Sequence, residues 1–207
     1  MNFPEFILAS QSPQRKELLE RAGYCFRVVA PTLHELQEAH AAPAQRAEAL
    51  AYFKARAVQQ QHPDALILGA DTLVACAGQV LGKARDERQA REMLATLSHA
   101  RHEVITGVAI LVPGPAGAGL DSARRFLASE ITYVTMRPWT EQETDRYLAS
   151  GEWRDKAGAY AIQESADAYV EKIEGSFTNV VGLPMELLER MFEQVKRCLS
   201  GTCKSRR

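Results

Sequence analysis

The 207-residue chain carries 25 basic and 26 acidic residues, a net charge of −1, and 46% of its residues are hydrophobic. A chain of this size can bury a core as one domain or as two tightly joined lobes. The balanced charge argues against a nucleic-acid-binding surface, and no apolar run approaches the roughly 20 residues that cross a bilayer. Because Glu5 stands where a signal peptide would carry cations and then apolar residues, we expect a cytoplasmic protein without a membrane partner.

The four cysteines, Cys25, Cys76, Cys198 and Cys203, are scattered along the chain and form no CxxC motif. This spacing argues against a zinc site. Free thiols are the simpler interpretation, and they fit a reducing cytosol.

Strands and helices alternate in the first half of the chain. Apolar runs predict the strands, and apolar residues at helical spacing behind a cap residue predict the helices. Ser12 and Pro13 suit the N-cap and first position of the first helix, and Asp86 suits the N-cap of a later one. The expected elements are a strand over 3–9, a helix over 13–22, a strand over 24–30, a helix over 42–61, strands over 65–69, 73–76 and 80–81, and a helix over 86–98.

In the second half, two long segments are expected to pair as strands. The glycine-rich residues 113–119 between them indicate a hairpin connection rather than a dinucleotide-binding loop, because a strand follows them and not a helix. Thr140 and Glu143 have the spacing of a capping box. The expected elements are strands over 102–112 and 126–136, a helix over 140–150, irregular chain over 151–167, strands over 168–173 and 176–181, and a helix from 184 to about 199.

This order of elements predicts an α/β fold. We expect a mixed twisted sheet with helices on both faces and a cleft between two lobes. No repeat or low-complexity linker divides the chain, so residues 1–197 are expected to form a single domain, followed by a disordered basic tail over 198–207.

The segment Ser10-Gln11-Ser12-Pro13-Gln14-Arg15-Lys16 follows an apolar strand and opens a helix. A helix N-terminus offers unpaired N–H groups and the positive end of a dipole, and here two hydroxyls and two cations accompany it. These features favour an anion site in which Ser10, Ser12 and Arg15 bind phosphate. An ordinary capped helix is the alternative.

Four charged side chains elsewhere are candidates for the same chemistry. Asp71 follows the strand over 65–69 and is suited to act as a general base on water or as a magnesium ligand, although a turn aspartate has the same local pattern. Lys54 and Lys83 are candidate phosphate ligands, and Glu35 is a candidate second metal ligand. Solvated side chains are the alternative for each of these three.

Residues 155–163, with the sequence DKAGAYAIQ, combine charges, small residues and an amide without clear periodicity. That composition is typical of a binding loop on a rigid scaffold, and a plain connection is the alternative.

Seven stretches in order resemble the Maf family of nucleotide pyrophosphatases, also described as septum-formation proteins. The similarity spans roughly residues 6–192 and rests on the motifs ILASQSPQRKELL, FKARAV, LGADTLV, VLGKARD, ITGVAI, DKAGAYAIQ and NVVGLP. The resemblance implies a Maf/ITPase-like fold and the hydrolysis of a nucleoside triphosphate to the monophosphate and pyrophosphate with a divalent metal, Mg or Mn.

The same resemblance implies roles for individual residues. Asp71 matches the catalytic acid of the family's GAD motif, and Glu35 matches an acidic position near the metal. Sequence alone leaves open which of the two holds metal and which takes the proton. Four further residues match positions that hold the triphosphate: Ser10, Arg15, Lys54 and Lys83.

The nucleobase preference is predicted from Thr72 and Gln163. The family branch with Thr and Gln at these positions prefers dTTP and UTP, and a branch with Gln and Glu prefers 7-methyl-GTP. A glutamine amide offers both a donor and an acceptor, which match a pyrimidine's N3–H and carbonyl oxygen. We therefore expect dTTP and UTP as substrates.

Several residues depart from the family's pattern. Gln14 stands where the pyrimidine branch usually has Arg and the methyl-GTP branch an aromatic residue, so it is a further candidate for substrate specificity. The remaining departures are His34, Ala84, Ala161 and Glu164. These departures keep two alternatives open, a 7-methyl-GTP or broad-range pyrophosphatase and a non-catalytic nucleotide-binding regulator of cell division. A homodimer is an expectation of the resemblance.

Overall fold

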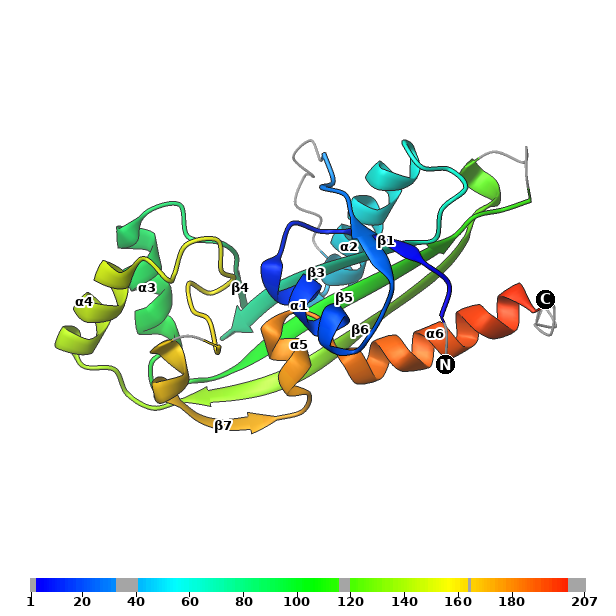
Figure 1. Cartoon of the computed structure of the whole chain (residues 1–207). Helices are drawn as coiled ribbons and strands as arrows, with labels where there is room; N and C mark the ends of the chain where they lie inside the picture. The colour runs from blue at the N-terminus through cyan, green and yellow to red at the C-terminus, as the bar shows by residue number, and fades with distance from the viewer. Residues whose placement is uncertain (1–2, 33–40, 116–119, 164, 201–207) are drawn as a thin grey trace.

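The computed structural model describes residues 3–32, 41–115, 120–163 and 165–200. A seven-stranded sheet runs through the molecule in the order β2-β1-β3-β5-β6-β7, with β4 paired to β3 (Figure 1). β1 is parallel to β2 and β3, whereas the pairs from β3 onward are antiparallel. The strands are β1 (Phe6–Ala9), β2 (Phe26–Val28), β3 (Ile67–Cys76), β4 (Gln79–Leu81), β5 (Arg101–Val112), β6 (Arg124–Met136) and β7 (Val170–Glu174).

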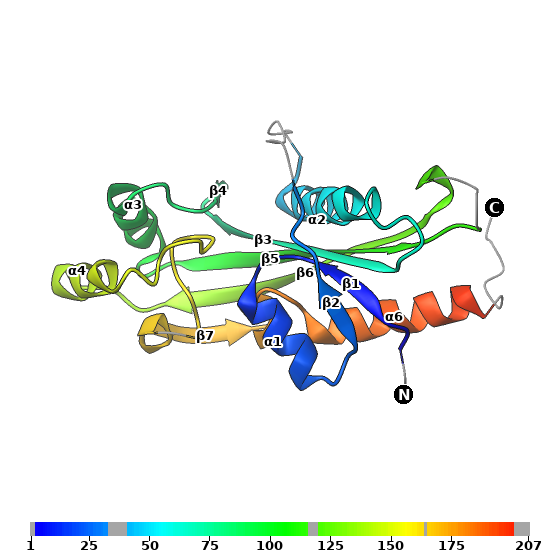
Figure 2. The same ribbon diagram turned by 45° about the horizontal axis from the view of Figure 1, so that its top comes forward.

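Helices cover both faces of the sheet (Figure 2). α2 lies on one face, α1, α5 and α6 lie on the other, and α3 and α4 gather at one end of the long strands. The α-helices are α1 (Pro13–Arg21), α2 (Pro43–Gln59), α3 (Glu87–Leu97), α4 (Glu141–Ser150), α5 (Phe177–Val181) and α6 (Met185–Leu199), and 3₁₀ turns occupy Leu120–Ser122 and Ser165–Tyr169. The mixed α/β sheet predicted from the sequence is thus confirmed.

The buried apolar residues form a core on each face of the sheet and another at its end. One cluster packs α6 and α1 under β1, β3 and β5, and two smaller clusters pack α2 on the opposite face. A separate cluster joins α3, α4 and the segment after α4 around Trp153 and Tyr160. None of the described helices is long and apolar enough to span a membrane.

Two glycines let α2 approach the sheet closely. A Cβ atom on Gly69 of β3 would lie 2.3 Å from the carbonyl oxygen of Ala51, and one on Gly107 of β5 would lie 2.2 Å from that of Ala47. These are backbone atoms of α2, so any side chain at either position would push the helix away. This contact sets the height of α2 above β3 and brings Lys54 within reach of Asp71.

The course of β3 places two polar residues between its neighbours. β1 pairs with β3 as far as Gly69, and β4 begins to pair with it at Val74. Residues 70–73 therefore lie between the end of one neighbour and the start of the next. Because side chains alternate along a strand, Asp71 points toward α2 and Thr72 toward α1 and α5.

Most predicted elements are present, with two corrections. Asp86 caps α3, and the capping box of Thr140 and Glu143 opens α4, as predicted. The strand predicted over 176–181 is wrong, because these residues form α5 with Ser176 as its N-cap. The apolar strand also does not end before Asp71 but continues through it as β3.

The boundary predicted at residue 198 falls within a helix. α6 includes Cys198 and Leu199, and Cys198 is buried. Residues 201–207, with Cys203, lie outside the described part of the chain, as do residues 116–119 of the predicted hairpin connection. The pairing of β5 with β6 that this connection was expected to join is confirmed.

Candidate active site

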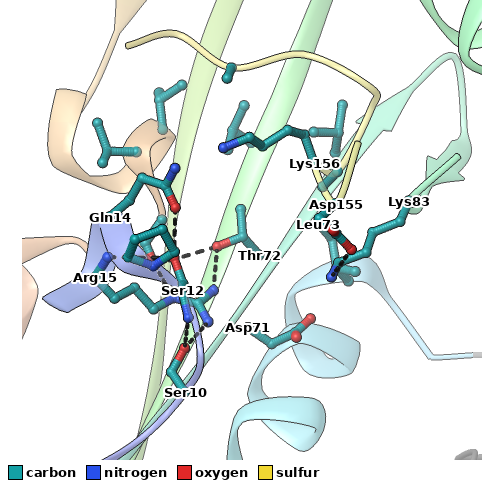
Figure 3. Close-up of a pocket in the computed structure, with 18 of the residues that line it drawn as sticks. Ser10, Ser12, Gln14, Arg15, Asp71, Thr72, Leu73, Lys83, Asp155 and Lys156 are labelled. Atoms are coloured by element: carbon teal, nitrogen blue, oxygen red, sulfur yellow. Dashed lines mark hydrogen bonds and ion pairs between the residues drawn. The ribbon is translucent and has the colours of Figure 1, made fainter. Parts of the chain in front are cut away.

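A cavity of about 770 Å³ opens between the end of β1, the N-terminus of α1, the middle of β3 and the segment after α4. This volume lies within the range of small-molecule sites. Figure 3 shows Ser10, Arg15 and Thr72 on one side, with Lys83 and Asp155 across from them. Nine described residues predicted for the site line this one cavity: Ser10, Ser12, Gln14, Arg15, Lys54, Asp71, Thr72, Lys83 and Gln163.

Arg15 is a buried cation at the inner wall of the cavity, with 8% of its surface exposed. Its guanidinium donates through Nε to the Gly182 carbonyl (2.8 Å), through Nη1 to Ser10 Oγ (3.1 Å) and through Nη2 to Thr72 Oγ1 (3.1 Å). Burial lowers the pKa of Arg15, and the nearby Asp71 carboxylate opposes that shift. The side chain is thus held in one orientation.

The hydroxyl hydrogen of Ser10 is available for a hydrogen bond to a ligand in the cavity. Its oxygen accepts from the Ser12 backbone N–H (3.2 Å) and from Arg15 (3.1 Å). Within the described chain, no acceptor takes the hydroxyl hydrogen. The hydroxyl can therefore donate to an oxygen atom of a ligand in the cavity.

Ser12 caps α1 and orients Gln14. Its oxygen accepts from the Arg15 backbone N–H (3.5 Å), and its hydroxyl donates to Gln14 Oε1 (3.0 Å). The amide nitrogen of Gln14 is then the end directed away from Ser12 (Figure 3). Lys16, on the next position of the helix, is exposed and pairs with Glu20 at 3.6 Å, so its charge does not join the cavity.

Lys54 of α2 and Asp71 of β3 form an ion pair in the cavity, with 24% and 14% of their side chains exposed. Burial lowers the pKa of Lys54, while the charge of Asp71 and its hydrogen bond to Lys54 raise it. Lys54 contacts one carboxylate oxygen, Oδ1. Among the described residues, no donor binds the second oxygen, which leaves it available to water, substrate or metal.

Lys83 lies on the far side of the cavity and is tied to the loop after α4. Its ammonium is 3.4 Å from Asp155 Oδ1, in an exposed pair. The backbone joins the same two segments, because Lys83 and Ala157 form a β-bridge and the Gly158 N–H donates to the Gly82 carbonyl (2.9 Å).

The loop is held in an unusual backbone conformation. Asp155 and Ala159 have positive φ angles of 60° and 58°, which non-glycine residues adopt at a cost. The sequence singled out this loop but not the individual roles of Asp155 and Lys156, and Figure 3 shows both at the cavity. Gly182, which holds Arg15 through its carbonyl, lies in the NVVGLP motif, but no individual role was predicted for it because the group it uses belongs to the backbone.

The two residues expected to set nucleobase preference differ in how they are engaged. Gln163 is exposed at the cavity, on the loop side. The Thr72 hydroxyl is instead bonded to Arg15 (3.1 Å) and to Thr106 Oγ1 (2.9 Å). Thr72 therefore contributes to the wall that holds Arg15.

Of the two predicted metal ligands, Asp71 is described and Glu35 lies outside the described residues. His34 and Glu164, which depart from the family's pattern, also lie outside them. Within the described residues, no group of three or more His, Cys, Asp or Glu side chains is placed to hold a metal ion. Of the described carboxylates, Asp71 and Asp155 line the cavity.

Comparisons with known proteins identify the family. A dTTP/UTP pyrophosphatase of Moorella thermoacetica is 46% identical over 187 residues, covering 90% of this chain and 93% of that protein. Those of Bacillus cereus and Bacillus pumilus are 43% identical over 193 residues and 41% over 189, covering 93% and 91% of this chain and 91% and 95% of the relatives. The family model described as Maf-like protein matches residues 5–195, so the chain belongs to the Maf family.

Proposed function

We propose that this protein hydrolyses nucleoside triphosphates, with dTTP and UTP as the preferred substrates, to the monophosphate and pyrophosphate. The observation that carries this proposal is the convergence of Arg15, Lys54 and Lys83 on one cavity that also contains Asp71. Its relatives at 41–46% identity over nearly their whole lengths are dTTP/UTP pyrophosphatases. A triphosphate is the ligand whose charge this set of cations complements.

The hydrogen-bond donors near the N-terminus of α1 are proposed to bind the phosphates. Ser10 has a hydroxyl hydrogen that no described acceptor takes, and Arg15 has two N–H groups beyond the three that the protein engages. Ser12 caps α1 and fixes the start of the helix, where backbone N–H groups and the dipole favour an anion. Lys83 approaches the same anion from the opposite wall.

The reaction requires water to attack the α-phosphorus as the bond from that phosphorus to the bridging oxygen breaks. Asp71 is assigned as the group that orients the water and accepts its proton through the oxygen that Lys54 does not engage. Lys54 and Arg15 then stabilise the negative charge that develops on the phosphoryl oxygens. Pyrophosphate leaves with the bridging oxygen.

A divalent metal fits the donors present. Mg²⁺ is commonly held by one or two carboxylates together with substrate phosphates, and Asp71 presents such a carboxylate beside the proposed phosphate positions. Mg²⁺ or Mn²⁺ would supply electrostatic stabilisation of the phosphoryl oxygens. Glu35 is proposed as the second carboxylate, and the division of roles between Asp71 and Glu35 stays open.

Nucleobase selection is assigned to Gln14 and Gln163, which approach the cavity from the helix and from the loop. Their amides provide donors and acceptors for the carbonyl oxygens and N3–H of uracil or thymine. Cytoplasmic location and homodimerisation stay predictions of the sequence.

The test measures the rate of pyrophosphate release from a panel of canonical and modified triphosphates in the presence of Mg²⁺ or Mn²⁺. We expect dTTP and UTP to give the highest kcat/KM, and ¹⁸O from labelled water to enter the monophosphate. Asp71→Asn should lower kcat by about a thousandfold. Asp64→Asn is the matched control, because Asp64 is an exposed residue in the turn before the same strand.

Three outcomes would contradict the proposal in different ways. An Asp71→Asn variant with wild-type kcat would remove Asp71 from the chemistry. Highest kcat/KM for 7-methyl-GTP would overturn the pyrimidine preference. Nucleotide binding without hydrolysis of any triphosphate would instead favour a non-catalytic regulator.

A further inference from the structure

A chain of hydroxyl groups runs from Arg15 into the buried sheet. Arg15 Nη2 donates to Thr72 Oγ1 (3.1 Å), Thr72 Oγ1 lies 2.9 Å from Thr106 Oγ1, and Thr106 Oγ1 donates to the carbonyl of Asn179 (3.1 Å). Thr106 lies on β5 directly opposite Thr72 and is fully buried, with 0% of its surface exposed. It does not line the cavity.

The end groups of this chain fix the direction of each hydrogen bond. A guanidinium only donates and a carbonyl only accepts, whereas each hydroxyl has a single hydrogen. Thr106 gives its hydrogen to Asn179, so Thr72 must give its hydrogen to Thr106. The Thr72 oxygen then presents its lone pairs to Arg15. The Gly182 carbonyl lies farther from Thr72, at 3.5 Å, and already accepts from Arg15 Nε at 2.8 Å.

The carbonyls that anchor this arrangement come from one segment. Asn179 belongs to α5 and Gly182 is its C-cap residue. The Asn179 side chain fixes α5 to the sheet, since its amide nitrogen donates to the Val104 carbonyl (2.9 Å) and to Thr132 Oγ1 (3.0 Å). The guanidinium is thus held by α5 directly through Gly182 and indirectly through Thr106.

We propose that Thr106 is a positioning residue of the active site, which acts through Thr72 to set the plane of the Arg15 guanidinium. This inference rests on the proposed function, because it assigns the two remaining Arg15 N–H groups to the triphosphate. It also gives Thr72 a different role from nucleobase reading: its hydroxyl is a link between Arg15 and the sheet. A loss at Thr106 should therefore affect all triphosphates equally.

The chain offers a matched control at Thr132 on β6. Thr132 is also fully buried and also contacts α5, where its hydroxyl donates to the Ser176 carbonyl (3.1 Å) and accepts from the Asn179 side chain. It makes no bond to Thr72 or Arg15 among the described contacts. Thr106→Val and Thr132→Val thus each remove one buried hydroxyl from the same cluster. Only the first breaks the hydroxyl path from the sheet through Thr72 to Arg15, whereas the second acts on α5 through Asn179 and Ser176.

The test compares Thr106→Val, Thr106→Ser and Thr132→Val by kcat/KM with dTTP, UTP and one purine triphosphate, and by calorimetric binding of inorganic tripolyphosphate. Thr106→Val should lower kcat/KM about 10- to 100-fold for every substrate and weaken tripolyphosphate binding about tenfold. Thr106→Ser should stay within about threefold of wild type. Thr132→Val should lower kcat/KM by clearly less than Thr106→Val does, because it loosens α5 through Asn179 and Ser176 but leaves the hydrogen bond between Thr72 and Thr106 in place. Both valine variants should lose thermal stability.

A double variant separates positioning from general destabilisation. In an Arg15→Lys background the Nη2 bond to Thr72 is already gone, so adding Thr106→Val should lower kcat/KM by less than about threefold. If Thr106→Val does not fold, Thr106→Cys takes its place, because the thiol keeps the side-chain size and is a weak donor.

Equal kinetics and equal tripolyphosphate binding for the Thr106 and Thr132 variants would overturn the inference. So would a Thr106→Val loss confined to one nucleobase, which would indicate base reading. If wild type binds tripolyphosphate but hydrolyses no triphosphate, the proposed function fails, and the binding comparison still decides the role of Thr106.

Discussion

Lys54 and Asp71 share a half-buried position, and the environment of the lysine explains why its charge matters to the site. Burial disfavours the charged ammonium and lowers the pKa of Lys54, whereas the Asp71 carboxylate favours it. Each member of the pair therefore offsets the desolvation of the other. A cation held in this way needs little reorganisation when charge develops on a phosphoryl oxygen nearby.

Lys54→Met is expected to lower kcat/KM about 100- to 1,000-fold, because it removes a pre-positioned cation from the site. Lys54→Arg should retain part of the activity, since it keeps the charge in a different shape. The control is Lys16→Met, which changes an exposed lysine outside the cavity and should keep wild-type kinetics. Steady-state kinetics with dTTP decide the matter, and a fully active Lys54→Met variant would remove Lys54 from the proposed mechanism.

Gln14 is expected to affect substrate choice rather than phosphate binding. Ser12 holds its amide oxygen, which leaves the amide nitrogen as the group that meets a substrate acceptor. Gln14→Ala should change the ratio of kcat/KM between dTTP and GTP by about tenfold, the scale of one lost hydrogen bond to a base. A variant at Lys54 should lower both values and leave the ratio unchanged. Competition between the two nucleotides measures this ratio directly, and an unaltered ratio would assign base selection elsewhere.

At the scale of elements, the site depends on how α2 is seated on the sheet. Gly69 and Gly107 allow helix backbone to touch strand backbone, and the resulting height of α2 places Lys54 at Asp71. The site is thus coupled to packing several residues away from the charged groups. The same seating fills the core around Ala47, Ala51 and Ala55, whose small side chains permit the close approach.

Gly107→Ala should lower the free energy of unfolding by about 3 kcal/mol, since the new methyl group would lie 2.2 Å from the Ala47 carbonyl and backbone cannot yield cheaply. We also expect kcat/KM to fall, because displacement of α2 moves Lys54 away from Asp71. Gly82→Ala is the control for stability, as no atom lies within 4 Å of its added Cβ. Urea unfolding of the two variants provides the measurement. Equal midpoints would show that α2 is not seated by Gly107.

Local signals in the sequence were sufficient for several elements and failed at α5. The side chains of Asp86 and Thr140 each accept a hydrogen bond from the backbone N–H three residues later, so both N-caps can be predicted from the local sequence. In α5, the β-forming residues Phe177, Val180 and Val181 suggested a strand. The Ser176 cap and the bonds from Asn179 to β5 and β6 decide for a helix, and those bonds depend on tertiary structure.

In the candidate site, too, some features could be predicted from the local sequence and others depend on tertiary structure. Motifs in order were enough to name Ser10, Arg15 and Asp71 as partners. The link from Thr72 to Thr106 depends on the antiparallel register of β3 and β5, which neither strand encodes alone. The role of the Gly182 carbonyl was likewise not predicted. Gly182 belongs to the NVVGLP motif and its φ of 122° favours glycine, but neither feature identifies its carbonyl as the acceptor for Arg15.

At the scale of the whole molecule, the cavity lies between two parts of the hydrophobic core. One part is formed by the sheet and the helices on its faces, and the other is the cluster of α3, α4 and the segment after α4 at the end of the sheet. Tyr160 belongs to that end cluster and also lines the cavity. Its hydroxyl lies 2.9 Å from His102 Nε2 on β5, and the two rings meet edge to face. This buried contact joins the loop that forms one wall of the site to the central sheet.

His102 should make the stability of this junction depend on pH. Its side chain is 1% exposed, and burial lowers its pKa from 6.5 to about 4. Between those values the unfolded chain binds a proton that the folded protein does not, so stability is fully present above pH 6.5 and is lost as pH falls toward 4. At pH 5 the loss attributable to this group is about 2 kcal/mol.

The measurement is urea unfolding of wild type and His102→Gln at pH 7.5 and pH 5. Carboxylates titrate in both proteins, so the effect of His102 appears in the difference between them: the stability advantage of wild type should shrink by about 2 kcal/mol at the lower pH. A difference between wild type and His102→Gln that does not change with pH would mean that the imidazole takes up its proton without cost in the folded protein, which is incompatible with a buried ring bonded to Tyr160.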